Sequence, residues 1–96
     1  MTDSARIADI ARCLGEPARV AILAALAAAP ERTAGDLTRI AGLAPSTVSE
    51  HLARLVTSGL LTVRADGRKR YYRLADAEVG ALLAAIRALA DRLDRR

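Results

Sequence analysis

The start of the chain carries apolar residues at helical spacing. They recur at steps of three, four and seven positions, and the stripe is made of Ile7, Ile10, Ala11 and Leu14. Ser4 precedes this stripe as a candidate N-cap, and Gly15 follows it. The pattern predicts a first helix over about residues 4–14.

Two further helices are predicted from their end signals. Pro17 is preorganised for a first helical turn and opens a second helix, which runs to about Ala29 and stops before Pro30. Thr33 and Asp36 resemble a capping box at the start of a short third helix, with Asp in place of the usual Glu.

A turn at Gly42 separates the third helix from a fourth. Pro45 begins the fourth helix and Gly59 ends it. Its apolar residues share one face, and they are Val48, Leu52, Leu55 and Val56. A step of 100° per residue puts small polar side chains opposite them. Two short helices joined by a tight turn form a helix-turn-helix, here over residues 33–58.

Residues 60–74 read as a β-hairpin. The arms LLTVR and KRYYRL flank Asp66-Gly67, a dipeptide that tolerates the positive φ of a tight turn. Residues 64–73 hold five basic side chains and one acidic, whereas the other 86 residues balance ten against ten. A basic ribbon fits a phosphate backbone, and its place directly after the helix-turn-helix makes the unit winged.

Asp76 begins a last amphipathic helix that extends to about residue 95. Its apolar residues are spaced three, four, three and four apart, and they are Val79, Leu82, Ile86, Leu89 and Leu93. A chain of 96 residues buries a modest fraction of its surface, so pairing with a second copy is expected. The predicted fold is one mainly α domain over residues 1–96, a winged helix-turn-helix with five helices and a two-stranded wing between the fourth and fifth.

Composition indicates which class of partner and which cellular compartment to expect. A net charge of +4 favours an anionic partner, nucleic acid before membrane, because the basic residues do not line a long apolar helix face. Fourteen Arg against one Lys indicate a coding bias, so only the clustered arginines are informative. A single Cys, with no signal peptide or transmembrane run, leads us to expect a cytoplasmic chain.

Two segments of the chain resemble the ArsR/SmtB family of dimeric winged-helix repressors. They are LGEPARVAILAAL at residues 14–26 and AGDLTRIAGLAPSTVSEHLARLVTSGLLTVRADGRKRYYRL at residues 34–74. The second is the more specific, because it holds the helix-turn-helix, SEHLARL, a Gly-Leu step and the return strand in order. The resemblance implies a homodimer on a two-fold symmetric operator, with the fourth helix in the major groove of double-stranded DNA. It also implies dimerisation through residues 4–14 and 76–95.

The expected DNA-binding residues lie on the fourth helix and the wing. On the helix, short hydroxyls permit close approach to DNA, while Glu50 and Arg54 are long enough to act as readers. In the family resemblance, Ser46, Thr47, Ser49 and Glu50 match major-groove positions, and His51 matches the recurrent His before Leu52. For a lone His we expect a structural or phosphate-contacting role. The expected wing contacts are Arg68, Lys69 and Arg70, whereas Arg64 and Arg73 brace the strands, and Tyr72 and Leu74 pack the wing onto the body. The alternative for the helix is an ordinary solvated face.

Metal binding is not expected from this sequence. Where one metal-sensing group of the family carries Cys thiolates in the third helix, this chain has Thr33, Ala34, Gly35 and Thr38. Asp76 and Glu78 could hold a hard cation weakly, but a helix cap and a surface charge explain them better. One His without Cys, Asp or Glu at ligand spacing cannot assemble a site.

Cys13 is expected to lie off the apolar stripe of the first helix, half-buried and inert. The alternative hypothesis is a redox role, in which Cys13 pairs with its counterpart or a small thiol because Arg6 or Arg12 favours the thiolate.

The predicted function is a sequence-specific DNA-binding repressor with no enzymatic activity and no cofactor. One Cys, one His and no phosphate-binding Gly loop leave no catalytic set. The alternative is a winged-helix protein-interaction module that does not read DNA. The sequence leaves open the operator and any small-molecule or redox effector.

Overall fold

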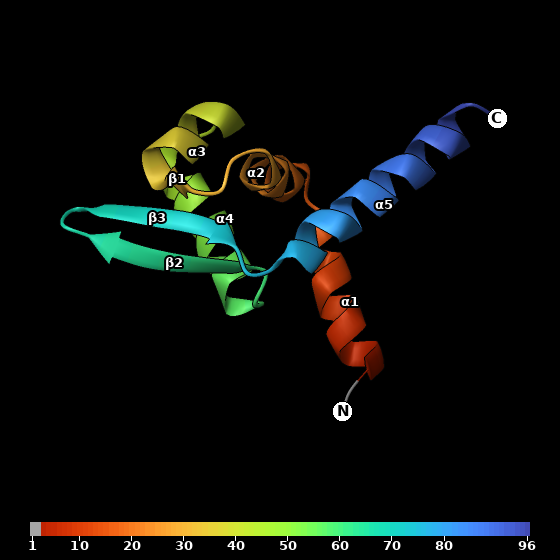
Figure 1. Ribbon diagram of the computed structural model, residues 1–96, viewed down its shortest axis with the longest axis horizontal. Helices are drawn as coiled ribbons and strands as arrows, with labels where there is room; N and C mark the ends of the chain where they lie inside the picture. The colour runs from red at the N-terminus through yellow and green to blue at the C-terminus, as the bar shows by residue number, and fades with distance from the viewer. Residues whose placement is uncertain (1–2) are drawn as a thin grey trace.

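Five helices and three strands make up the fold, shown in Figure 1 as a computed structural model that describes residues 3–96. The helices are α1 (Asp3–Leu14), α2 (Pro17–Ala28), α3 (Ala34–Ala41), α4 (Pro45–Thr57) and α5 (Ala77–Asp94). The strands are β1 (Arg32–Thr33), β2 (Leu61–Asp66) and β3 (Lys69–Leu74). The predicted helices are confirmed in order, but Ser4 lies inside the first turn of α1 and is not its N-cap.

Capping side chains set the starts of α3 and α5, as the sequence predicts. The Thr33 hydroxyl accepts a hydrogen bond from the Asp36 backbone N–H at 3.1 Å, and the Asp36 carboxylate accepts one from the Thr33 N–H at 3.1 Å. The Asp76 carboxylate accepts a bond from the Glu78 N–H at 2.7 Å. These bonds satisfy amide donors that the first turn of a helix leaves unpaired.

The predicted two-stranded wing is confirmed as β2 and β3, and a short strand that was not predicted, β1, completes a sheet in the order β1-β3-β2. Arg32 and Thr33 pair with Tyr72 and Tyr71 of β3. The turn also differs by one residue from the prediction, because Asp66 pairs with Lys69 and the two turn residues are Gly67 and Arg68. Gly67 has φ +63°, which fits the glycine-first type II′ turn of tight hairpins.

The core is aliphatic and centres on α2, which contacts each of the other four helices. Leu52 and Leu55 are buried and confirm the predicted inner face of α4. Tyr72 is buried and Leu74 packs against the core, so the base of the wing is anchored as predicted. The remaining buried residues are Cys13, Ile22, Leu23, Leu26, Leu37, Val48, Ser58, Leu60, Leu61 and Val79.

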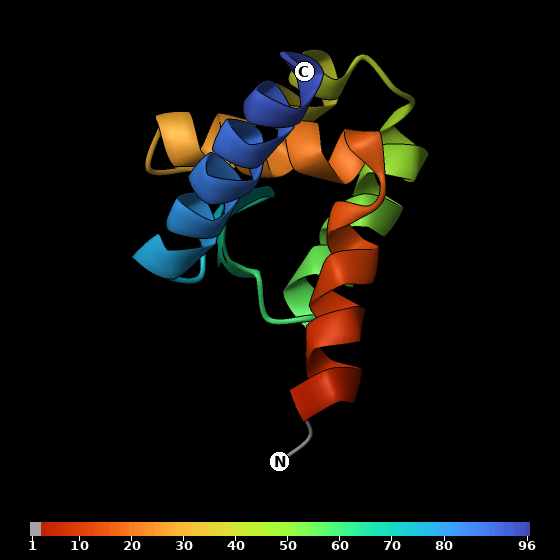
Figure 2. The same cartoon turned by 90° about the vertical axis from the view of Figure 1, so that its right-hand side faces the viewer.

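Two helices extend from the body on the side away from the hairpin (Figure 1). Figure 2 faces this side and shows α5 crossing in front of α2, with α1 below α2 and in front of α4. Large apolar side chains remain exposed on both helices: Ile7 at 66%, Leu82 at 38%, Ile86 at 45%, Leu89 at 46% and Leu93 at 48%. Among residues 3–96, no helix has the length and apolar character needed to cross a bilayer.

Candidate nucleic-acid interface

The outer face of α4 presents the predicted polar side chains together. Ser46, Ser49 and Glu50 are exposed, and Thr47 is half-buried beside them. The buried leucines on the opposite side fix the rotation of the helix, so this face is presented to solvent in a single orientation. The face is narrow and polar, as a helix that enters a groove requires.

A basic hollow of about 410 Å³ lies between the start of α3 and the wing tip. Its walls are residues 33–36 and Arg39 on one side and residues 68–70 on the other. Four cationic side chains therefore surround it against one carboxylate, Asp36, which pairs with Arg39. Arg39 was not predicted, because one isolated arginine carries no signal in a chain with fourteen.

A second hollow lies next to the first, on the side toward α4. It has a volume of about 240 Å³ and lies between α3 and α4, with Ser49 among its lining residues. Ala34 and Gly35 line both hollows. The wing tip and the polar face of α4 thus border one continuous surface around the start of α3.

The root of the wing is held by Glu31, which the sequence did not single out. The Glu31 carboxylate accepts two hydrogen bonds from Arg64, both at 2.9 Å, and lies 3.9 Å from the Arg73 Nε. The Arg64 guanidinium also lies 4.3 Å from the centre of the Tyr71 ring. The bonds from Arg64 hold the pKa of Glu31 below its usual range and raise the pKa of Arg64. Arg64 and Arg73 therefore brace the strands, as predicted.

Comparison with known proteins gives consistent matches. Residues 14–64 match a family described as a helix-turn-helix domain. The Escherichia coli HTH-type transcriptional regulator YgaV is 35% identical over 80 residues, which are 83% of this chain and 81% of that protein. A probable mercury resistance operon repressor of Streptomyces lividans is 35% identical over 79 residues, 82% of this chain and 62% of its own length.

Solved structures share the whole architecture. The homodimeric winged helix-turn-helix DNA-binding domain Mb0332 of Mycobacterium bovis, a possible ArsR-family transcriptional regulator, has a TM-score of 0.87. The match covers 100% of this chain and 94% of that chain at 28% identity. The Mycobacterium tuberculosis protein Rv0081 also has a TM-score of 0.87, with 30% identity over 99% of this chain and 98% of that chain. This chain belongs to the ArsR/SmtB family of transcriptional regulators. The family resemblance and the predicted winged helix-turn-helix are confirmed, and the chain is a DNA-binding transcriptional regulator.

His51 of this ArsR-type regulator turns toward the body of the protein. Its Nδ1 lies 3.3 Å from an Arg19 guanidinium nitrogen, and because arginine only donates, the ring nitrogen accepts. The same guanidinium donates to the carbonyl oxygens of Cys13 at 2.8 Å and Arg12 at 3.1 Å. His51 thus ties α4 to the junction of α1 and α2, which is the structural role that the sequence analysis allowed.

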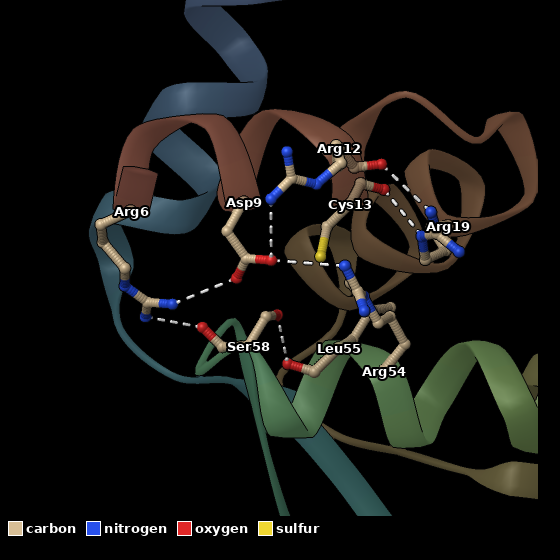
Figure 3. Close-up of polar contacts among 8 residues, drawn as sticks. All are labelled: Arg6, Asp9, Arg12, Cys13, Arg19, Arg54, Leu55 and Ser58. Atoms are coloured by element: carbon tan, nitrogen blue, oxygen red, sulfur yellow. Dashed lines mark hydrogen bonds and ion pairs between the residues drawn. The ribbon is translucent and has the colours of Figure 1, made fainter. Parts of the chain in front are cut away.

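Arg54 is held on the α1 side of α4, as Figure 3 shows. Its guanidinium donates to the Asp9 carboxylate at 3.3 Å, and Arg6 donates to the other oxygen of Asp9 at 3.4 Å. Arg6 also donates to the Ser58 carbonyl at 2.7 Å, at the C-terminal end of α4. Two of the residues predicted to bind DNA, His51 and Arg54, are therefore engaged with other helices.

Cys13 is fully buried in the core, so the half-buried position expected from the sequence was wrong. It lies on the side of α1 shared with Arg6 and Asp9, but that side faces α4 (Figure 3). A redox sensor needs an accessible thiol, which this placement denies to Cys13. The burial contradicts the redox alternative and fits an inert core cysteine.

One of the two carboxylates considered for a metal, that of Asp76, serves as a helix cap. Asp76 caps α5, with its carboxylate bound to the Glu78 N–H. Within residues 3–96, no three His, Cys, Asp or Glu side chains come together as a possible metal site.

Proposed function

We propose that this regulator is a homodimeric repressor that binds a two-fold symmetric operator. The observation that carries the proposal is the continuous surface around the start of α3, where the polar face of α4 and the basic wing tip meet. The homodimeric state of the Mycobacterium bovis domain and the repressor among the relatives support it. We also propose that the chain is cytoplasmic, like its DNA partner, and has no catalytic activity.

The DNA contacts divide between base edges and phosphates. Ser46, Thr47, Ser49 and Glu50 are exposed enough to meet base edges in the major groove. Arg68, Lys69 and Arg70 supply backbone contacts from the wing, and Arg39 adds a fourth cation across the hollow. His51 acts by holding α4 through Arg19, and Arg54 reaches a phosphate only when it leaves Asp9.

The dimer interface in this proposal is made by α1 and α5. Both carry large exposed apolar side chains, and the last part of α5 extends beyond the body (Figure 1). A stripe of half-exposed leucines on a protruding helix is stabilised when a symmetric partner covers it.

The test is DNA binding by a wing variant at several salt concentrations. Arg68→Ala with Lys69→Ala should weaken binding to every sequence and lower the slope of log K against log salt by about 0.9 for each lost phosphate contact. Arg95→Ala with Arg96→Ala removes the same charge from the end of α5, which lies away from the hairpin, and should leave the slope unchanged (Figure 1). Glu50→Ala should instead change sequence preference.

A protein-interaction module is the alternative function, and the same experiment separates the two. Equal DNA affinity for the wing variant and the parent would refute the proposed operator contact. Repression is checked separately, by a reporter under the bound promoter, which should be derepressed by the wing variant.

A further inference from the structure

The four side chains at the wing root lie on one face of the sheet. Side chains two residues apart in a strand point to the same face, so Tyr71 and Arg73 lie opposite the buried Tyr72. Arg64 is the cross-strand partner of Tyr71 and shares that outer face. The contacts of Glu31 with Arg64 and Arg73 place its carboxylate there as well.

The ion pair of Arg64 with Glu31 connects the two edges of the sheet. Arg64 belongs to β2 at one edge, and Glu31 immediately precedes β1 at the other edge. The guanidinium therefore crosses β3 over the Tyr71 ring before it meets the carboxylate. A fork of two parallel bonds fixes the direction of the guanidinium as well as its distance.

Within residues 3–96, no third strand pairs with the outer part of the hairpin. Strand β1 ends at Thr33, opposite Tyr71, so β3 has no third-strand partner toward the turn. Residues 62–70 are exposed throughout. The direction of the wing tip is consequently determined where the hairpin leaves the body, at Tyr71 and Arg64.

We propose that Glu31 is a positioning residue for DNA binding. It fixes the angle of the wing through Arg64 and Arg73, so that the wing tip and α4 meet one duplex together. The inference rests on the proposed function. Glu31 also keeps two of the five wing cations away from phosphates and leaves Arg68, Lys69 and Arg70 as the phosphate contacts.

Electrostatics alone predicts the opposite effect of removing this charge. Glu31→Gln raises the net charge by one and releases Arg64 and Arg73 next to the DNA, which would strengthen binding and steepen its salt dependence. Loss of positioning weakens binding, because a mobile wing must be ordered on the DNA. An increase in affinity would therefore indicate a purely electrostatic effect of Glu31, and a decrease would indicate that Glu31 positions the wing.

The experiment compares Glu31→Gln with Asp91→Asn, which removes the same charge at an exposed residue on the face of α5 opposite its apolar stripe. Operator affinity should fall about fivefold in the first variant and stay level or rise slightly in the second. An affinity in Glu31→Gln equal to or above that of Asp91→Asn would overturn the proposal. Circular dichroism at the assay temperature verifies that both variants are folded.

A second pair of variants keeps every charge in place. Arg64→Lys removes the fork and the ring contact and should weaken binding with an unchanged salt slope, whereas Arg96→Lys, at an exposed position beyond α5 and away from the hairpin, should bind like the parent. Equal affinities for the two variants would contradict positioning by Arg64.

Hydrogen exchange in the absence of DNA tests the role of Glu31 independently of operator binding. Amides of residues 62–70 should exchange several-fold faster in Glu31→Gln than in Asp91→Asn. Unchanged exchange would refute the role of Glu31 even if the parent bound its operator, and faster exchange would support it even if no operator were bound.

Discussion

Truncation of Leu89 should weaken the dimer that we propose. Leu89 remains 46% exposed in the single chain. Complete burial of a leucine side chain is worth about 2 kcal/mol, so about 1 kcal/mol remains to be gained when a partner covers it. In an isologous interface the residue occurs twice, and Leu89→Ala should therefore cost about 2 kcal/mol per dimer. The dimer Kd should rise about thirtyfold.

Sedimentation equilibrium over a dilution series measures this change directly. Asp91→Asn serves as the control, because a rotation of 200° from position 89 puts it on the opposite face of α5. Its Kd should match that of the parent. An unchanged Kd for Leu89→Ala would refute the reasoning and place the contact between copies on another surface.

Two further predictions follow from burial and capping. The Cys13 thiol should react with a thiol reagent only as the protein unfolds, so that its rate rises with denaturant, and rapid reaction in native buffer would contradict its burial. Hydrogen bonds from Thr33 lower the pKa of Asp36 below its usual value of 3.8. The charged Asp36 carboxylate therefore stabilises the folded state above pH 3.8, and this stabilisation is lost as the pH falls through the lower pKa of the folded state. The thermal midpoint of Asp36→Ala should thus lie below that of the parent at neutral pH, with a difference that narrows in acid, and a constant difference would argue against this linkage.

Local chemistry made much of the fold predictable. Helix ends depend on a few neighbouring residues, and Thr33, Asp36 and Asp76 cap their helices as their types suggest. The buried face of α4 could likewise be read from its spacing of apolar residues. Strand β1 was missed because two residues are too short to show any alternation.

Residues that act across long distances in the chain were not predictable. Glu31 and Arg64 are 33 positions apart, and only the order of the strands brings them together. Arg54 and Asp9, which are 45 positions apart, meet through the docking of α1 on α4. Periodicity also cannot tell a core from an interface between copies: Ile7 of the apolar stripe is 66% exposed, whereas Cys13 beside the stripe is buried.

The two faces of α4 assign folding and recognition to separate side chains. Val48, Leu52 and Leu55 hold the helix in the core, while Ser46, Ser49 and Glu50 face solvent. Exposed positions tolerate substitution with little change in the free energy of unfolding. A lineage of such proteins can therefore acquire new operator preferences by point mutation at the outer face without passing through unstable intermediates.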